Sequence, residues 1–80
     1  MVTENEVKIN ARGLSAPGPR LMAETALQKG ACRLMRVVVS DTEAVDDLRD
    51  HFTRKGVTVK IDQVGEEFHV LLKFEETQDV

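Results

Sequence analysis

The apolar residues of this chain repeat at two different periods, and the order in which the periods follow one another limits the possible folds. Near the N-terminus, Val7, Ile9 and Ala11 alternate with polar residues, which predicts a strand with one buried face. From residue 17 to about residue 29 the spacing becomes helical. Residues 34–39 form the most apolar run and end in three valines, which predicts a strand at the centre of a sheet.

The second half of the chain repeats this change of period. Ser40 and Glu43 have the spacing of a capping box. In this motif the serine hydroxyl accepts a hydrogen bond from a helix amide, and the glutamate carboxylate accepts one from the serine N–H. We therefore expect a helix that starts at Ser40, buries a stripe containing Val45 and Leu48, and ends at Gly56.

Two alternating segments complete the pattern, at residues 57–61 and 68–74, with a turn at Gly65 and Glu66 between them. They predict an antiparallel hairpin. The element order is then β-α-β-α-β-β. Since the strands have one polar face and each helix has one apolar stripe, we expect a two-layer α/β sandwich: a four-stranded mixed sheet with both helices on one face.

Length and charge limit the domain organisation and the class of protein. The 80 residues predict a single domain, with a core at residues 7–74 and residues 75–80 as a tail or the start of a linker. A net charge of −3 and the lack of an aromatic on the expected solvent face argue against nucleic-acid binding. The longest apolar run is far shorter than the roughly 20 residues that span a bilayer, and the acidic N-terminus is unlike a signal peptide, so a cytoplasmic protein is expected.

Cysteine and histidine offer few candidates for chemistry. Cys32 is the single cysteine, so no internal disulfide can form, and His51 and His69 lack the spacing of metal ligands. No metal or other cofactor is expected. Cys32 follows the first predicted helix, where the partial negative charge of the helix end disfavours a thiolate, so we interpret it as a small apolar residue.

The stretch GLSAPGP opens the first predicted helix. If Pro17 is the first helical residue, then Ala16 is the N-cap, a position at which alanine is about 1 kcal/mol worse than serine or aspartate. The amides of Gly18 and Arg20 would then face outward. Two interpretations fit these residues: Ser15 caps the helix, or the helix entrance is shaped to hold an anion at position 16.

The segment INARGLSAPGP, with this order of elements, resembles the TusA/SirA/YedF family of small sulfur-carrier proteins, whose signature is ARGL-x-C-P-x-P. The matching positions are Arg12, Gly13, Leu14, Pro17 and Pro19. The segment SDTEAVDDL resembles the family's T-D-P-x-A-x-x-D-[IL] motif. Its matching positions are Asp41, Ala44, Asp47 and Leu48, with Thr42 in place of the proline. The resemblance covers residues 7–74 and implies the fold expected above.

In this family the motif cysteine accepts a persulfide sulfur from a cysteine desulfurase or a rhodanese-like donor and passes it to an acceptor protein. The corresponding residue here is Ala16, whose methyl group cannot carry sulfur. The resemblance therefore implies a sulfur-carrier domain without its acceptor cysteine, inactive as a sulfurtransferase as given, and it leaves open whether the chain is an enzyme. The alternative is a non-catalytic interaction or regulatory module on the same fold. The family's YedF branch is linked with selenium metabolism.

Arg12 and Arg20 flank the predicted helix entrance. They are either solvated surface charges or groups that steer an anionic persulfide or a donor loop toward residue 16. The candidate site comprises both arginines, Gly13, Leu14, Pro17, Gly18 and Pro19, with Asp41 and Asp47 from the second motif.

Overall fold

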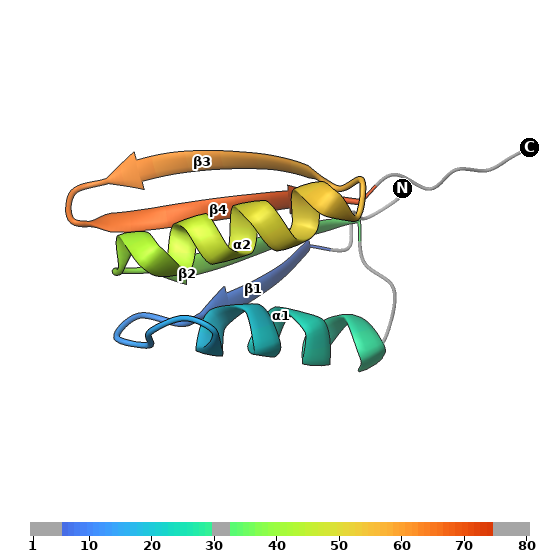
Figure 1. Ribbon diagram of the computed structural model, residues 1–80, viewed down its shortest axis with the longest axis horizontal. Helices are drawn as coiled ribbons and strands as arrows, with labels where there is room; N and C mark the ends of the chain where they lie inside the picture. The colour runs from blue at the N-terminus through green and yellow to red at the C-terminus, as the bar shows by residue number, and fades with distance from the viewer. Residues whose placement is uncertain (1–5, 30–32, 75–80) are drawn as a thin grey trace, which may run out of the picture.

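The computed structural model describes residues 6–29 and 33–74, and it contains four strands and two helices (Figure 1). In chain order they are β1 (Glu6–Asn10), α1 (Gly18–Lys29), β2 (Leu34–Val39), α2 (Thr42–Arg54), β3 (Thr58–Val64) and β4 (Glu67–Lys73). The predicted order of elements is confirmed.

The four strands form one mixed sheet in the order β1-β2-β4-β3. Strands β1 and β2 are parallel, so a crossover must join them, and α1 provides it. Strand β4 pairs antiparallel with both β2 and β3, which confirms the predicted hairpin. Strand β2 lies inside the sheet, as its run of valines predicts, while β1 and β3 are the edge strands.

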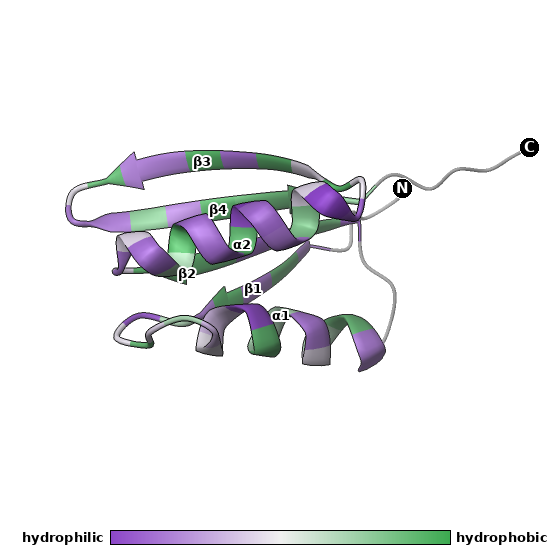
Figure 2. Cartoon of the chain, viewed as in Figure 1, coloured by the Kyte–Doolittle hydropathy of each residue, from purple (hydrophilic) through white to green (hydrophobic). Residues whose placement is uncertain are grey.

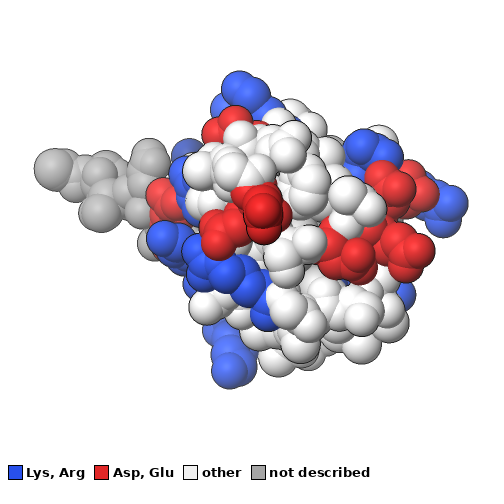
Figure 3. Space-filling view, turned by 90° about the vertical axis from the view of Figure 1, so that its left-hand side faces the viewer, with Lys and Arg blue, Asp and Glu red and all other residues white. Residues whose placement is uncertain are grey.

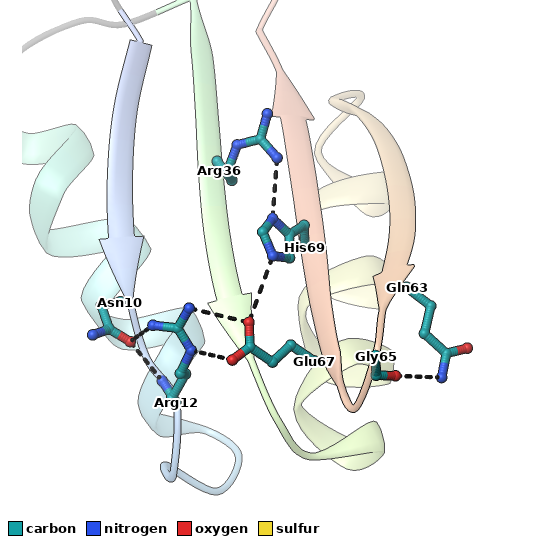
Figure 4. Close-up of polar contacts among 7 residues, drawn as sticks. All are labelled: Asn10, Arg12, Arg36, Gln63, Gly65, Glu67 and His69. Atoms are coloured by element: carbon teal, nitrogen blue, oxygen red, sulfur yellow. Dashed lines mark hydrogen bonds and ion pairs between the residues drawn. The ribbon is translucent and has the colours of Figure 1, made fainter.

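The core lies between the sheet and the two helices, which share one face of the sheet (Figures 1 and 4). Along β3 hydrophobic and hydrophilic residues alternate (Figure 2), and the burial of its residues alternates with them over most of the strand. From α2, Val45, Leu48 and Phe52 are buried at the spacing expected of one helix face. Each fully buried side chain of this size contributes about 1.5–3 kcal/mol relative to an exposed one. They meet a central set from the sheet: Met35, Val37, Val39, Val70 and Leu72.

The start of α2 differs from the sequence prediction. The N-cap residue is Asp41, and its side chain makes no capping hydrogen bond. The helix therefore begins one residue later than the capping box requires, and Glu43 stands only two residues after the cap instead of three. The Ser40 hydroxyl instead accepts a hydrogen bond from the Gly13 amide at 3.0 Å. The prediction of a capping box at Ser40 is wrong, because this hydroxyl serves the loop of the first motif.

Candidate functional site

Three connections of the chain meet at one end of the molecule: the β1–α1 loop, the β2–α2 connection and the β3–β4 turn (Figure 1). Two hydrogen-bonded contacts join them, from Gly13 to Ser40 and from Arg12 to Glu67. Figure 3 looks onto this end and shows uncharged surface between two groups of acidic side chains, with basic side chains alongside. The fold thus brings the two sequence motifs to one surface.

The β1–α1 loop is held by its own backbone. Gly13 has φ +82°, a conformation that favours glycine. The Gly18 amide donates to the Ser15 carbonyl at 2.8 Å, and the Leu21 amide donates to the Pro17 carbonyl at 3.0 Å. The peptide bond between Ala16 and Pro17 is cis. The two hydrogen bonds define the turn that leads into α1.

The start of α1 differs from the sequence prediction. Helix α1 begins at Gly18, and the Pro17 carbonyl accepts its first hydrogen bond, so Pro17 holds the N-cap position rather than Ala16. Ser15 accepts the hydrogen bond from the Gly18 amide through its carbonyl and not through its hydroxyl. The prediction that the Gly18 amide faces outward is wrong, because this amide donates to the Ser15 carbonyl and closes the turn. Pro19 lies in the first helical turn, as predicted, and is buried.

Ala16 lies in this turn and is half-buried, with a methyl group as its whole side chain. In the same loop Leu14 is 39% exposed and lies against Gly18, at which an added Cβ would be 3.5 Å from the Leu14 Cβ. The structure therefore presents a complete loop with no nucleophilic atom on the side chain of residue 16.

Arg12 points away from this loop, to the face of the sheet opposite the helices (Figure 4). Its Nε and Nη2 donate to the two carboxylate oxygens of Glu67 at 2.6 and 3.0 Å, and its Nη1 donates to Asn10 Oδ1 at 3.1 Å. The hydrogen bonds from Arg12 lower the pKa of Glu67 and raise that of the guanidinium. The positive charge of Arg12 is therefore already neutralised by a carboxylate on β4.

Arg20 is also engaged. Its Nε donates to Asp47 Oδ2 at 3.0 Å, between α1 and α2, and both side chains are about a quarter to a third exposed (25% and 30%). This ion pair joins the first motif to the second. Asp41 is the N-cap residue of α2. Of the two aspartates singled out in the second motif, Asp47 makes the contact with the first motif.

The outer face of the sheet carries a polar chain that sequence reasoning missed (Figure 4). Arg36 Nη1 donates to His69 Nδ1 at 3.1 Å, and His69 Nε2 faces Glu67 at 3.8 Å. Beneath these side chains Val38 is only 1% exposed, although it belongs to the outer face. The alternation of strand residues places them on that face, but only the strand register shows which of them meet.

Other candidate chemistry is limited in the described part of the chain. Within residues 6–29 and 33–74, no three His, Cys, Asp or Glu side chains gather into a group that could hold a metal ion. Neither described helix is long and apolar enough to cross a membrane. Cys32 lies outside the described residues.

A comparison with protein-family models matches residues 7–74 to the model described as Sulfurtransferase TusA. The chain belongs to the TusA family. Among solved structures, the crystal structure of a SirA-like protein from Desulfitobacterium hafniense is similar, with a TM-score of 0.74 and 20% sequence identity. The likeness covers 88% of this chain and 99% of that one, and it shows the same fold. No curated protein matches the sequence.

TusA-family membership gives the loop a context. The matched range includes both motifs and residue 16, so the turn on Ala16 lies within the family domain. Proteins of this sulfur-carrier family interact with sulfur donor and acceptor proteins. The end of the molecule at which the two motifs meet is therefore the candidate functional site.

Proposed function

We propose that this TusA-family domain keeps the sulfur-carrier scaffold but does not carry a persulfide at residue 16, so that it is inactive as a sulfurtransferase through this site. The observation that supports the proposal is the methyl side chain of Ala16 within a fully formed loop. A persulfide carrier needs a thiolate that attacks the terminal sulfur of the donor persulfide, and alanine has no atom that can do so.

The position itself suits a thiolate. The helix that begins two residues later directs its positive end toward the loop, and helix N-termini lower the pKa of a thiol from about 8.5 to as low as about 3.5–7.5. By membership in the family, the partners are a cysteine desulfurase or rhodanese-like sulfur donor and a downstream acceptor protein. The cellular compartment is the cytoplasm.

Intact mass spectrometry after incubation with a cysteine desulfurase and cysteine tests the proposal. In the transfer, the cysteine thiolate at residue 16 attacks the outer sulfur of the enzyme persulfide, a new S–S bond forms, and the enzyme thiolate leaves. We expect Ala16→Cys to gain one sulfur atom that a reducing agent removes. The unchanged chain and the matched control Ala16→Ser should gain none. Sulfur on the unchanged chain would contradict the proposal and would point to Cys32, which Cys32→Ser then checks.

A second candidate function is a non-catalytic interaction or regulatory module. Exposed apolar side chains favour it, because Leu14 and Leu21 are 39% and 50% exposed next to the helix entrance. If Ala16→Cys folds like the unchanged chain and also gains no sulfur, the scaffold is not a substrate of the desulfurase and the interaction module becomes the better assignment.

A further inference from the structure

A groove of about 400 Å³ runs beside the open edge of the sheet, between β1 and the outer side of α1. It is shallow, open to solvent and lined mostly by apolar surface. Two of its lining side chains are well exposed, Leu21 at 50% and Met22 at 39%. The lining residues are Ile9, Leu21, Met22, Thr25, Ala26 and Lys29.

The residues of α1 that line the groove form two adjacent rows along one helix face. Leu21, Thr25 and Lys29 are four residues apart, and Met22 and Ala26 form the neighbouring row. The groove therefore follows α1 over about two turns, with Ile9 of β1 on its other side, and this elongated shape suits an extended chain.

Strand β1 borders this groove and has a free edge. It is the outermost strand of the sheet, and within residues 6–29 and 33–74 it pairs with β2 alone (Figures 1 and 4). The Ala11 amide donates to the Val38 carbonyl at 2.9 Å. Since backbone groups alternate sides along a strand, the N–H and C=O groups of Lys8 and Asn10 face away from β2. These groups are available to a further strand.

Two lysines lie at this edge, one on each side of the sheet, although the chain as a whole has a net charge of −3. Lys8 lies on the edge strand and Lys29 lines the groove, and neither has a carboxylate of the described residues within 4.0 Å. Glu24, an acidic residue of α1, faces α2, where it pairs with His51 and Lys55. Because Lys8 alternates with Ile9, which lines the groove, the Lys8 side chain lies on the opposite face of the sheet. A strand added to β1 thus meets Lys29 with its groove-side residues and Lys8 with the residues between them.

We propose that the edge of β1 and the groove beside α1 bind an extended, acidic and apolar segment of a partner protein, which adds to the sheet as a fifth strand. The backbone of the segment pairs with Lys8 and Asn10. Its apolar side chains enter the groove against Leu21 and Met22, where Lys29 lies at the end, and the carboxylates that alternate with them lie near Lys8 on the outer face.

A second copy of the chain is the competing occupant of this edge. When antiparallel pairing of β1 with itself is centred on Lys8, two lysines lie directly opposite each other, and like charges in this position are destabilising. An acidic segment from another protein turns the same lysines into favourable contacts. The site does not include residue 16, so the result of the sulfur-transfer experiment does not bear on this proposal.

The experiment is a selection of random twelve-residue displayed peptides against the full chain, followed by mapping of the enriched peptides on ¹⁵N-labelled protein. We expect sequences that alternate apolar and acidic residues. They should shift the amide signals of β1 and α1 and slow hydrogen exchange at Lys8 and Asn10. Failure to enrich any sequence, or shifts confined to other elements, would overturn the proposal. Concentration-dependent shifts of β1 without peptide would also overturn it, in favour of a second copy.

Two variants and a matched control sharpen the result. Leu21→Glu should weaken binding of the selected peptide by about tenfold or more, equivalent to about 1.4 kcal/mol. The control is Val64→Glu, because Val64 is equally exposed at 51% but lies on β3, at the opposite edge of the sheet. Lys29→Glu should weaken binding of the acidic peptide and strengthen binding of a version that has lysine in place of its acidic residues. Equal effects of Leu21→Glu and Val64→Glu would contradict the assigned site.

Discussion

At the scale of single residues, the hydrogen bond from the Gly13 amide to the Ser40 hydroxyl fixes the loop that carries Ala16. The bond measures 3.0 Å and is solvent-exposed, so we expect Ser40→Ala to lower the free energy of unfolding by about 0.5–1 kcal/mol. Ser15→Ala is the matched control and should change it by less than about 0.5 kcal/mol, because Ser15 acts through its carbonyl. Urea unfolding followed by circular dichroism measures both, and an equal loss in the two variants would contradict this role for Ser40.

At the scale of elements, the Arg20–Asp47 ion pair couples α1 to α2. The two side chains are partly exposed, so the pair is worth less than a buried one, and we expect a coupling free energy of about 0.5–1 kcal/mol. A double-mutant cycle of Arg20→Gln and Asp47→Asn measures it, and the coupling should shrink in 1 M NaCl. The matched control is the more exposed pair Arg49–Asp46, within α2, for which we expect about 0.2–0.5 kcal/mol. A larger coupling for this control would refute the assignment.

The pair between Arg12 and Glu67 couples the end of β1 to β4 and makes stability depend on pH. Arg12 lowers the pKa of Glu67 from its ordinary value of 4.5, chiefly through the side-chain hydrogen bond. The stabilisation is therefore present above about pH 4.5 and is lost as the pH falls through the lower pKa of the folded state. Glu67→Gln should remove this part of the acid sensitivity, whereas the exposed neighbour Glu66→Gln should keep it. Urea midpoints between pH 6 and pH 3 test this, and parallel profiles for all three proteins would disprove it.

At the scale of the whole molecule, the sequence predicts the layers better than it predicts the site. Period-two and helical spacing determine which residues are buried, and so the order of elements and the central position of β2 follow from them. Side-chain partners depend on register and on the exact start of each helix, which periodicity does not determine. The Ser40 hydroxyl therefore accepts a hydrogen bond from Gly13 instead of capping α2. Arg12 pairs with Glu67, which is 55 residues away in the sequence. The methyl group at residue 16 follows from the sequence, but the turn that holds it does not.

We expect the folding of the whole domain to depend on Phe52. It is 1% exposed, the largest fully buried side chain, and its ring meets that of Phe74 at 6.2 Å, near the end of β4. We expect Phe52→Ala to lower the free energy of unfolding by about 3–5 kcal/mol. A chain of 80 residues has only about 4–12 kcal/mol in total, so this variant should be partly unfolded at 37 °C. The control Val64→Ala, at a side chain 51% exposed, should change stability by less than about 0.5 kcal/mol.

Since the chain has no Trp or Tyr, circular dichroism and methyl NMR signals must follow unfolding, and the two should coincide if the domain unfolds as one unit. Loss of the helical signal before the methyl signals of the sheet would show instead that α2 unfolds separately.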